Sequence, residues 1–236
     1  YAASMQKLLE DVSLQLIETY LGDVLRETGK LCFAGGVALN VKLNQRIIDL
    51  PHVDELFVQP AASDAGTAVG AASYVAHEMG DVIRKQEHVY LGPSFSTEDC
   101  RQACESHPEK PAFEQVDDAP QAAARLLADG HPVAWFQGRM EFGPRALGNR
   151  SILGDPSRPG IADRINEQIK YRERWRPFCP SILDRAAEDI LQTGHPAPYM
   201  TFAFTVADHW KERIPEVVHM DGTRWSPRPP TRAITR

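Results

Sequence analysis

A short segment rich in arginine and glycine, residues 138–150, carries the clearest chemistry in the sequence. Its letters, GRMEFGPRALGNR, include three arginines and three glycines. A guanidinium group is a planar fork of donors that matches the oxygens of a carboxylate or phosphate two at a time. Glycine lets the backbone come close to a ligand. The segment therefore predicts a loop that holds an anion.

A second basic cluster lies in the segment IKYRERWRPF, residues 169–178, which contains Lys170 and the arginines Arg172, Arg174 and Arg176. Residues 139–176 contain nine Lys+Arg and five Asp+Glu, whereas the whole chain has 26 against 32 and a net charge of −6. Charged runs usually form solvated surfaces, and that interpretation stays open. A basic island in an acidic chain nevertheless favours a compact phosphate-bearing ligand and disfavours nonspecific binding of nucleic acid.

The composition is that of a globular protein. The chain has 236 residues, of which 42% are hydrophobic, enough for one large domain or two smaller ones. Neither a membrane span nor a secretory leader is apparent, so we expect an intracellular, cytoplasmic protein. The four cysteines lack zinc-binding spacing, and buried free thiols are expected, with a zinc or redox pair as the lesser alternative. Because the chain starts without Met and ends in a Pro-rich stretch, we expect an internal fragment.

Helix and strand patterns alternate along the chain, which predicts an α/β fold. Apolar residues at helical spacing from Met5 to Val24 predict an amphipathic helix that ends near Gly29. A turn near 91–94 is expected to separate this unit from a second, α+β or mixed unit. The expected helices are 37–48, 65–79, 98–105, 119–128, 161–169 and 186–191, and the expected strands or extended pieces are 30–34, 55–60, 113–116, 132–136, 151–155 and 200–206.

The segment GGVALN lies where a strand meets a helix. Free N–H groups and the helix dipole at such a junction favour a phosphate. Gly35 and Gly36 could equally form a plain tight turn, with Asn40 an ordinary polar residue. The segment lacks the spacing of a P-loop or a Rossmann fingerprint.

Two acidic residues have competing interpretations. Asp64 stands at a helix start, where capping by Ser63 or Asp64 accounts for it fully; a metal there would need ligands from outside this sequence, since its histidines show no HxxxH or HExxH spacing. Glu141 could orient an arginine or hold magnesium, and a salt bridge to Arg139 or Arg145 is the simpler role.

Two aromatic residues accompany the second basic cluster. Trp175 and Phe178 could pack on guanidinium planes or on an adenine ring, or belong to a plain core.

Four segments together are similar to one known family. FAGGVALN, PAASDAGTAVGAA, GRMEFGPRALGNRSILGDP and INEQIKYRERWRPFCPSIL occur in the order found in the NodU/CmcH O-carbamoyltransferases, which include the tobramycin and cephamycin carbamoyltransferases. The resemblance covers most of residues 31–183. It implies the later part of an actin-like ATPase (ASKHA) domain over residues 1–86 and a C-terminally truncated YrdC-like α+β domain over 87–236.

The resemblance also implies an activity. In that family, carbamoyl phosphate and ATP form carbamoyladenylate in the YrdC-like domain, and the carbamoyl group passes to a hydroxyl of a small molecule such as a sugar, an antibiotic or a Nod-factor-like acceptor. Two phosphorylated substrates repel each other, so fixed guanidinium groups are needed to neutralise them.

Site residues follow from the same resemblance. The catalytic residues it implies are Arg145 and Arg150, at phosphate and carbamoyl contacts, and Lys170 and Arg172, which match the KxR signature of YrdC-like proteins. Asp64 would bind an iron-type divalent metal, Fe²⁺ or similar, and Mg²⁺ would accompany ATP. The residues implied to contact the nucleotide and cofactor are Gly35, Gly36, Asn40, Arg139, Gly143, Arg176 and Ser181.

Some expected parts lie outside the sequence. The family's HxxxH histidines would precede Tyr1, and its NTSFN segment would follow the YrdC-like region, so complete transfer is not expected of this fragment. The expected partners are carbamoyl phosphate and a small-molecule hydroxyl acceptor, with no membrane or nucleic acid; a homodimer is left open. The alternatives are an RNA-binding or regulatory module and a hydrogenase-maturation carbamoyltransferase, the latter disfavoured by the lack of CxxC pairs.

Overall fold

The computed structural model describes residues 1–84, 86–193, 195–219 and 223–225. Helices and strands are mixed, as expected for an α/β chain, and the strands of the described part form two-stranded sheets. Strand β1 (Lys30–Phe33) pairs with β2 (Glu55–Val58) in parallel. Strand β3 (Val133–Phe136) pairs antiparallel with β4 (Arg150–Leu153), and β5 (Ala203–Thr205) pairs antiparallel with β6 (Thr223–Trp225).

Helix α1 (Ala2–Thr28) ends where the sequence predicts. Gly29 has a φ of 66°, in the left-handed region, and its N–H donates to the carbonyl of Leu25. The helix packs on the core through Leu9, Leu14 and Ile17 together with Leu25. The rest of the predicted apolar stripe faces outward: the exposed residues are Met5, Leu8, Val12, Leu16, Tyr20 and Val24.

The predicted helix over 37–48 is divided in two. A 3₁₀ turn, η1 (Gly36–Leu39), comes first, and helix α2 (Val41–Ile48) follows. Between them Asn40 adopts an extended conformation, and its side chain accepts the N–H of Leu43 at 3.0 Å. This residue therefore caps a new helix instead of continuing the old one.

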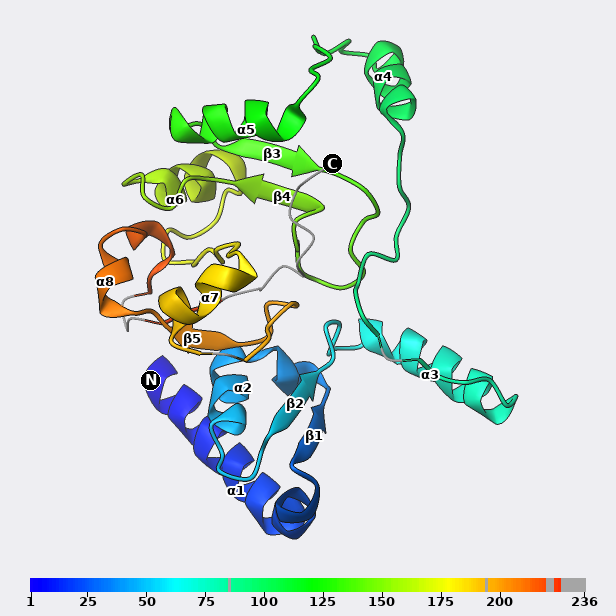
Figure 1. Ribbon diagram of the computed structural model, residues 1–236, viewed down its shortest axis with the longest axis vertical. Coiled ribbons are helices and arrows are strands. Elements are labelled where there is room, and N and C mark those ends of the chain that lie inside the picture. The colour runs from blue at the N-terminus through cyan, green and yellow to red at the C-terminus, as the bar shows by residue number, and fades with distance from the viewer. Residues whose placement is uncertain (85, 194, 220–222, 226–236) are drawn as a thin grey trace.

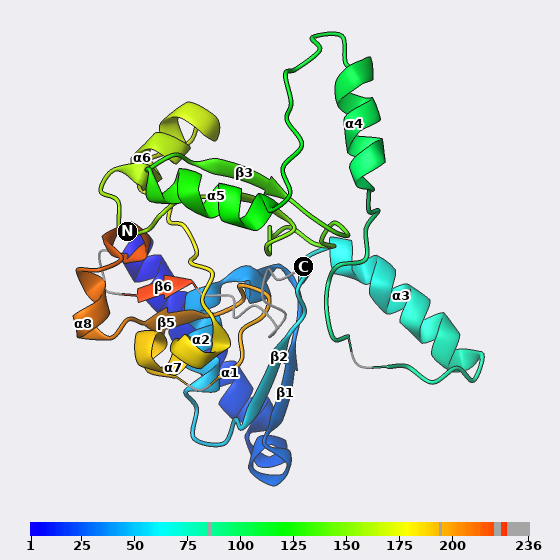
Figure 2. The same cartoon turned by 45° about the horizontal axis from the view of Figure 1, so that its top comes forward.

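Two helices stand away from the body of the molecule in Figures 1 and 2. Helix α3 (Ala65–Glu78) contains no buried residue. Helix α4 (Thr97–Ser106) starts with a capping box between Ser96 and Asp99 and also contains no buried residue. The piece expected to be extended at 113–116 is not a β-strand, because it pairs with no strand of the part of the chain that the structure describes.

The remaining helices lie near the later strands: α5 and α6 near β3 and β4, and α7 and α8 near β5 (Figure 1). Helix α5 (Ala119–Ala128) begins at the Asp118 cap, exactly over the predicted range. The predicted helix 161–169 is a short α6 (Ile161–Arg164) that continues as a π-helix, η2 (Ile165–Ile169). The later elements are α7 (Asp184–Leu191), α8 (Asp208–Lys211) and the 3₁₀ turn η3 (Pro215–Val217).

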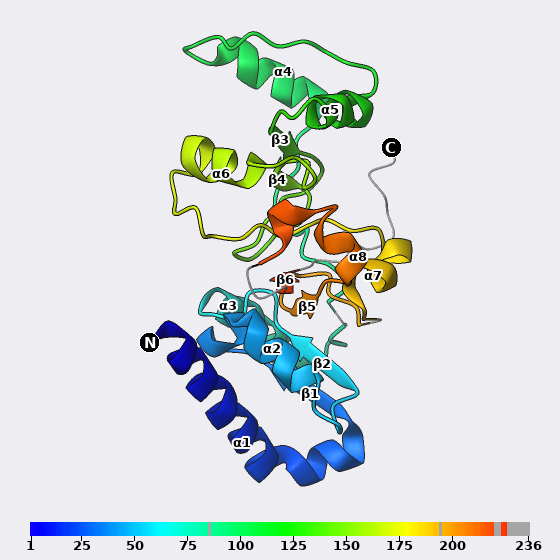
Figure 3. The same cartoon turned by 90° about the vertical axis from the view of Figure 1, so that its left-hand side faces the viewer.

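The main core joins the two ends of the chain. Leu43, Ile47 and Val58 from α2 and β2 pack in one cluster with Phe202 and Phe204 around β5. In Figure 3, α1, α2 and β1–β2 lie below α7 and β5. Packing thus crosses the boundary that the sequence places at residue 86.

Two further expectations from the sequence concern the burial of the cysteines and the presence of membrane-spanning helices. The four cysteines are free thiols, as expected, but none is buried: Cys32 and Cys100 are exposed, and Cys104 and Cys179 are partly exposed. Within the described ranges, no helix has both the length and the apolar content needed to cross a membrane.

Candidate anion-binding site

The first basic segment is the connection of a β-hairpin. The register of β3 and β4 pairs Phe136 with Arg150, so residues 137–149 form the loop between the strands. The N–H of Gln137 donates to the carbonyl of Asn149 at 3.0 Å and closes the base of this loop. The hairpin therefore fixes both ends of the segment that the sequence predicts to hold an anion.

A buried carboxylate organises the inside of the loop. Glu141 is only 5% exposed, and its Oε1 accepts the N–H groups of Leu147 at 2.7 Å and Asn149 at 2.8 Å. Its Oε2 accepts Nε of Arg150 at 2.9 Å. Burial is the largest influence and raises the pKa of Glu141, but these donors together outweigh it, so the pKa is lowered. The carboxylate is thus held ionised as the internal anchor of the loop.

The partner of Glu141 differs from the sequence expectation of a salt bridge to Arg139 or Arg145. The ion pair forms with Arg150 instead, because the hairpin register returns β4 beside the start of the loop. With its oxygens occupied by these donors, Glu141 does not offer the open carboxylate that magnesium would need.

Arg139 fastens the loop to the preceding segment. Its Nε donates to the carbonyl of Gly92 at 2.9 Å and one terminal nitrogen donates to that of Leu91 at 2.8 Å. Beside it, the N–H of Gly92 donates to the carbonyl of Met140 at 2.9 Å, and the N–H of Met140 donates to that of Pro93 at 3.0 Å. Arg139 therefore uses several of its donors on the backbone, where it holds the loop in place.

The second basic cluster follows the π-helix. Tyr171 has a φ of 46°, and this left-handed residue turns the chain between Lys170 and Arg172. Burial and the positive charge of Arg172 lower the pKa of Lys170. Burial and the charge of Arg176 likewise lower the pKa of Arg172, against an opposing effect of Glu173. The charge of Arg172 thus repels that of Lys170, and the charge of Arg176 repels that of Arg172.

Arg172 is held on two sides. Its Nε donates to Oδ1 of Asn166 at 2.6 Å, and its guanidinium lies 4.7 Å from the ring centroid of Phe178. The prediction that Phe178 packs on a guanidinium agrees with this contact. Lys170 has no side-chain hydrogen bond or ion pair within the described part of the chain.

The other residues of this segment differ in their surroundings. Arg176 pairs with Glu173 at 3.0 Å, whereas Arg174 turns to Glu167. Trp175 is 76% exposed, so it does not belong to a core. Ser181 is also exposed.

Arg145 connects the two basic segments. It is partly buried, and burial lowers its pKa while an electrostatic interaction with Cys179 opposes the shift. Cys179 comes three residues after Arg176, so this interaction brings the hairpin loop close to the end of the second basic segment.

The paired-glycine turn meets the hairpin loop at one short segment. The N–H of Gly35 donates to the carbonyl of Ala62 at 2.7 Å. A Cβ placed on Gly143 would lie 3.5 Å from both the Cβ of Ala61 and the carbonyl oxygen of Pro60. Residues 60–62, which follow β2, thus contact the paired-glycine turn through Gly35 and the hairpin loop through Gly143.

Asn40 is already engaged. Besides capping α2, it exchanges amide hydrogen bonds with Gln6 of α1, at 2.8 Å and 3.1 Å. Gly36 is exposed and has open space around it. Gly35 and Gly36, which were expected to contact a nucleotide, are exposed. The side chain of Asn40, expected to do the same, is instead bonded within the protein, to α2 and to Gln6 of α1.

The structure does not bear out Asp64 as a capping side chain. Asp64 precedes α3 but makes no side-chain cap hydrogen bond, since its own backbone is already helical. It is exposed. Across the described residues there is no group of three or more His, Cys, Asp or Glu side chains that could hold a metal. The ligand set present here therefore does not fit an iron site by itself.

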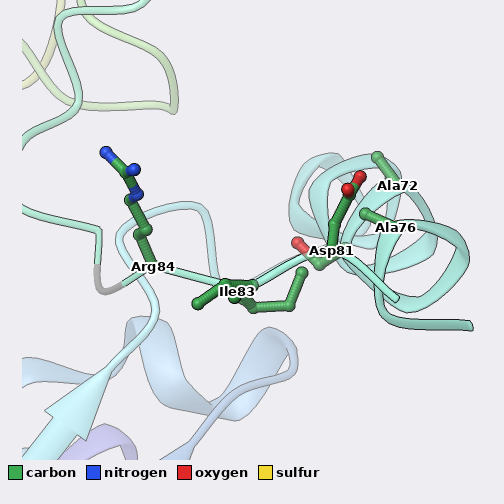
Figure 4. A pocket seen from close by; sticks show the side chains of 7 residues that line it. Ala72, Ala76, Asp81, Ile83 and Arg84 are labelled. Carbon is green, nitrogen blue, oxygen red and sulfur yellow. The ribbon is translucent and has the colours of Figure 1, made fainter. Parts of the chain in front are cut away.

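A shallow depression lies elsewhere, between α3 and the segment that follows it. It is lined by Asp81, Ile83 and Arg84 of that segment and by Ala72 and Ala76 of the helix; Figure 4 shows Asp81 beside the two alanines and Arg84 pointing away from the helix. It is lined by none of the residues expected at the site, so it is separate from the basic region.

Sequence reasoning missed the residues that support the arginines. Asn166 is fully buried, yet it stands in a polar stretch, INEQIK, that gives no sign of burial. The hydrogen-bonding of Glu141 to Leu147 and Asn149 was also not foreseen. A search for amphipathic periodicity would find neither, because Glu141 lies in a loop and Asn166 lies in a π-helix.

Comparison with known proteins gives the family. Residues 1–73 match the family described as carbamoyltransferase N-terminus, and residues 124–226 match the one described as carbamoyltransferase C-terminus. The hairpin loop and the second basic cluster both fall in the second match. The first match contains the paired-glycine turn and Asp64.

Relatives come from bacteria and an archaeon. The chain is 38% identical over 233 residues to nodulation protein NolO of Bradyrhizobium diazoefficiens, covering 94% of this chain and 41% of that protein. It is 38% identical over 195 residues to nodulation protein U of Rhizobium tropici, covering 82% and 32%. An uncharacterized protein of Methanocaldococcus jannaschii is 37% identical over 231 residues, covering 94% and 37%. The chain thus spans between about a third and two fifths of the length of these curated relatives. It belongs to the carbamoyltransferase family.

Proposed function

We propose that this chain carries the anion-binding part of an ATP-dependent O-carbamoyltransferase. The observation that carries the proposal is the placement of Lys170, Arg172 and Arg176 on one short turn, where Arg172 is fixed by Asn166 and Phe178 and where burial and a neighbouring cation lower the pKa values of Lys170 and Arg172. Positive charges held together at a cost in stability are typical of sites that bind a negative ligand. Arg145 adds a fourth cation from the hairpin loop.

Carbamoyl phosphate and ATP suit such a site. Both carry several negative charges, and bringing them together requires cations that are fixed beforehand. Arg145, Lys170, Arg172 and Arg176 would bind and neutralise the phosphates. Arg150 would take part through donors not used on Glu141.

The proposed chemistry balances with one water. Water cleaves carbamoyl phosphate to carbamate and phosphate; a carbamate oxygen then attacks the α-phosphorus of ATP, and pyrophosphate leaves with the electrons of the broken P–O bond. An acceptor hydroxyl next attacks the carbamoyl carbon, loses its proton, and AMP leaves. The acceptor proposed is a small molecule such as a sugar, an antibiotic or a Nod-factor-like oligosaccharide.

We also propose a division of labour between two parts of the chain. We place an actin-like ATPase part in residues 1–86 and a YrdC-like part in residues 87–236, with the proposed nucleotide contacts at Gly35, Gly36 and Asn40. The approach of Gly143 to residues 60–62 brings the basic loop beside the first part. Such a chain would work in the cytoplasm, where ATP is made.

Metal enters this proposal only as the Mg²⁺ that accompanies ATP and shields its phosphates. An iron-type metal at Asp64 would depend on ligands beyond the described residues. The protein's own residues account for binding and orienting the two anions.

The test is adenylate formation by the purified chain. With ATP, Mg²⁺ and carbamoyl phosphate, we expect release of pyrophosphate and a carbamoyladenylate signal by mass spectrometry. Arg145→Ala and Lys170→Ala should abolish both signals. Arg174→Ala is the matched control from the same segment, because Arg174 is turned to Glu167, and it should keep them.

Two other results would decide against the proposal. Equal loss in all three variants would mean that a general basic surface, not a specific site, supports the reaction. A folded chain that forms no product and binds RNA in a salt-dependent manner would indicate an RNA-binding module.

A further inference from the structure

Asn166 is a fully buried polar residue beside the proposed anion site. It lies in the π-helix η2, a distortion that is frequent at functional sites. Its Nδ2 donates to the backbone carbonyls of Arg174 at 3.2 Å and Arg176 at 3.1 Å. Its Oδ1 accepts Nε of Arg172 at 2.6 Å. One carboxamide therefore ties three successive basic positions together.

The main chain of Asn166 contributes a fourth bond. Its carbonyl accepts the N–H of Arg172 at 3.0 Å, so the same residue holds both the backbone and the side chain of that arginine. Phe178 covers the guanidinium as well. Fixing a long side chain before a ligand arrives removes the entropy that would otherwise be lost on binding.

The chemistry of a carboxamide matters here. Two carbonyl oxygens face Nδ2, and a carboxylate in its place would have no proton to give them. Oδ1 is a neutral acceptor, so Arg172 is oriented without being neutralised. Arg150 shows the contrasting arrangement, because its partner Glu141 carries a full negative charge.

We propose that Asn166 is a positioning residue that holds Arg172 in place, fully charged, for the phosphate of carbamoyl phosphate. This inference rests on the proposed function of the same site. Asn166 itself is too deeply buried to touch the ligand, so it acts through Arg172.

The experiment is a double-mutant cycle on ligand affinity, measured by calorimetry with carbamoyl phosphate as the probe. The proteins are wild type, Asn166→Ala, Arg172→Gln and the double variant. We expect each single change to weaken binding roughly tenfold, about 1.4 kcal/mol. Because Asn166 acts through Arg172, the double variant should bind as weakly as Arg172→Gln and no weaker.

Asn44→Ala is the matched control for loss of a buried amide. Asn44 is also fully buried, and its Nδ2 donates to two backbone carbonyls, those of Ala38 and Thr201, at 2.8 Å each. Its removal should cost similar stability and leave carbamoyl phosphate affinity unchanged. If Asn166→Ala unfolds, Asn166→Asp serves in its place; it keeps the shape and the acceptor but adds charge and loses both donors, and should also bind at least tenfold more weakly.

The outcomes separate the two proposals. No binding by wild type would overturn the proposed function itself. Binding by wild type together with unchanged affinity in the Asn166 variants, or with losses that simply add in the double variant, would overturn the positioning role. Equal loss in Asn44→Ala would show that stability alone is being measured, and would overturn it too.

Discussion

Gly143 lies against Ala61, where a Cβ on the glycine would be 3.5 Å from that of the alanine. The carbonyl oxygen of Ala61 in turn lies under Gly66 of α3, 2.3 Å from where a Cβ on that glycine would be. The hairpin loop is therefore in contact with the segment that follows β2, and the same segment leaves no room for a side chain at Gly66 near the start of α3. This contact holds the basic loop against the first part of the chain.

The first prediction concerns the Gly143 side of this segment. Gly143 and Gly148 have nearly equal φ values, 105° and 104°, but open space surrounds Gly148. In both variants valine would have to adopt this positive φ, and the resulting backbone strain costs about 1–3 kcal/mol. Gly143→Val should lose about 1 kcal/mol or more beyond Gly148→Val in urea denaturation, because its added carbons must displace Ala61. Equal losses would mean that the contact is unimportant.

The second prediction concerns the Gly66 side. Gly66→Ala forces its Cβ into a backbone carbonyl and should destabilise the protein by about 1–3 kcal/mol. Gly70, one turn later in α3, has nothing within 4 Å of the same added atom. Gly70→Ala should stabilise by about 0.5–1 kcal/mol through helix propensity. Thermal and urea unfolding of the pair would show opposite signs; the same sign for both would contradict the packing described.

The third prediction concerns Glu141 and pH. Its pKa is lowered in the folded chain, so its stabilising effect is present above the unfolded pKa of about 4.3 and is lost as the pH falls through the lower folded value. Glu141→Gln should cost about 2–3 kcal/mol at pH 7, and its difference from wild type should shrink below about pH 4.

The control for this prediction is Glu105→Gln. Glu105 is an exposed carboxylate paired with Arg101 on α4, and its replacement should cost under about 1 kcal/mol. Urea titrations of the three proteins at pH 7 and at acid pH give the comparison. A gap between Glu141→Gln and wild type that stays constant with pH would refute the assignment.

The fourth prediction concerns Lys170. Its pKa is lowered by burial and by Arg172, so the folded chain is destabilised while Lys170 is charged, and stability rises with pH between the folded pKa and the higher unfolded one. Lys170→Gln should therefore raise stability slightly at pH 7 while it lowers carbamoyl phosphate affinity. The stability gain should vanish by about pH 11, above the unfolded pKa near 10.4. A variant less stable than wild type at pH 7 would contradict the repulsion described.

Local sequence signals located most of the elements. The stop of α1 at Gly29 and the start of α5 at Asp118 were both predictable, because a left-handed glycine and an N-cap act within a few residues. The split at Asn40 was less visible, since the same letters, VALNVKLNQRII, have good helical spacing throughout.

The site was predictable in its residue types but not in its pairings. Arginine and glycine content marked the loop, and the resemblance to a family marked Lys170 and Arg172. The ion pair of Glu141 with Arg150 depends on hairpin register, and the burial of Asn166 depends on a π-helix. Both are tertiary features that a propensity or a spacing does not encode.

The shared core has a consequence for the order of events during synthesis. Asn44 donates to the carbonyl of Thr201, 157 residues later, and Leu43 and Ile47 lie in one cluster with Phe202 and Phe204. At a ribosomal rate of roughly 5–20 residues per second, the later partners emerge about 8–30 seconds after the earlier ones. During that interval the nascent chain exposes an incomplete apolar surface, which makes α2 and β2 natural targets for chaperones on the ribosome.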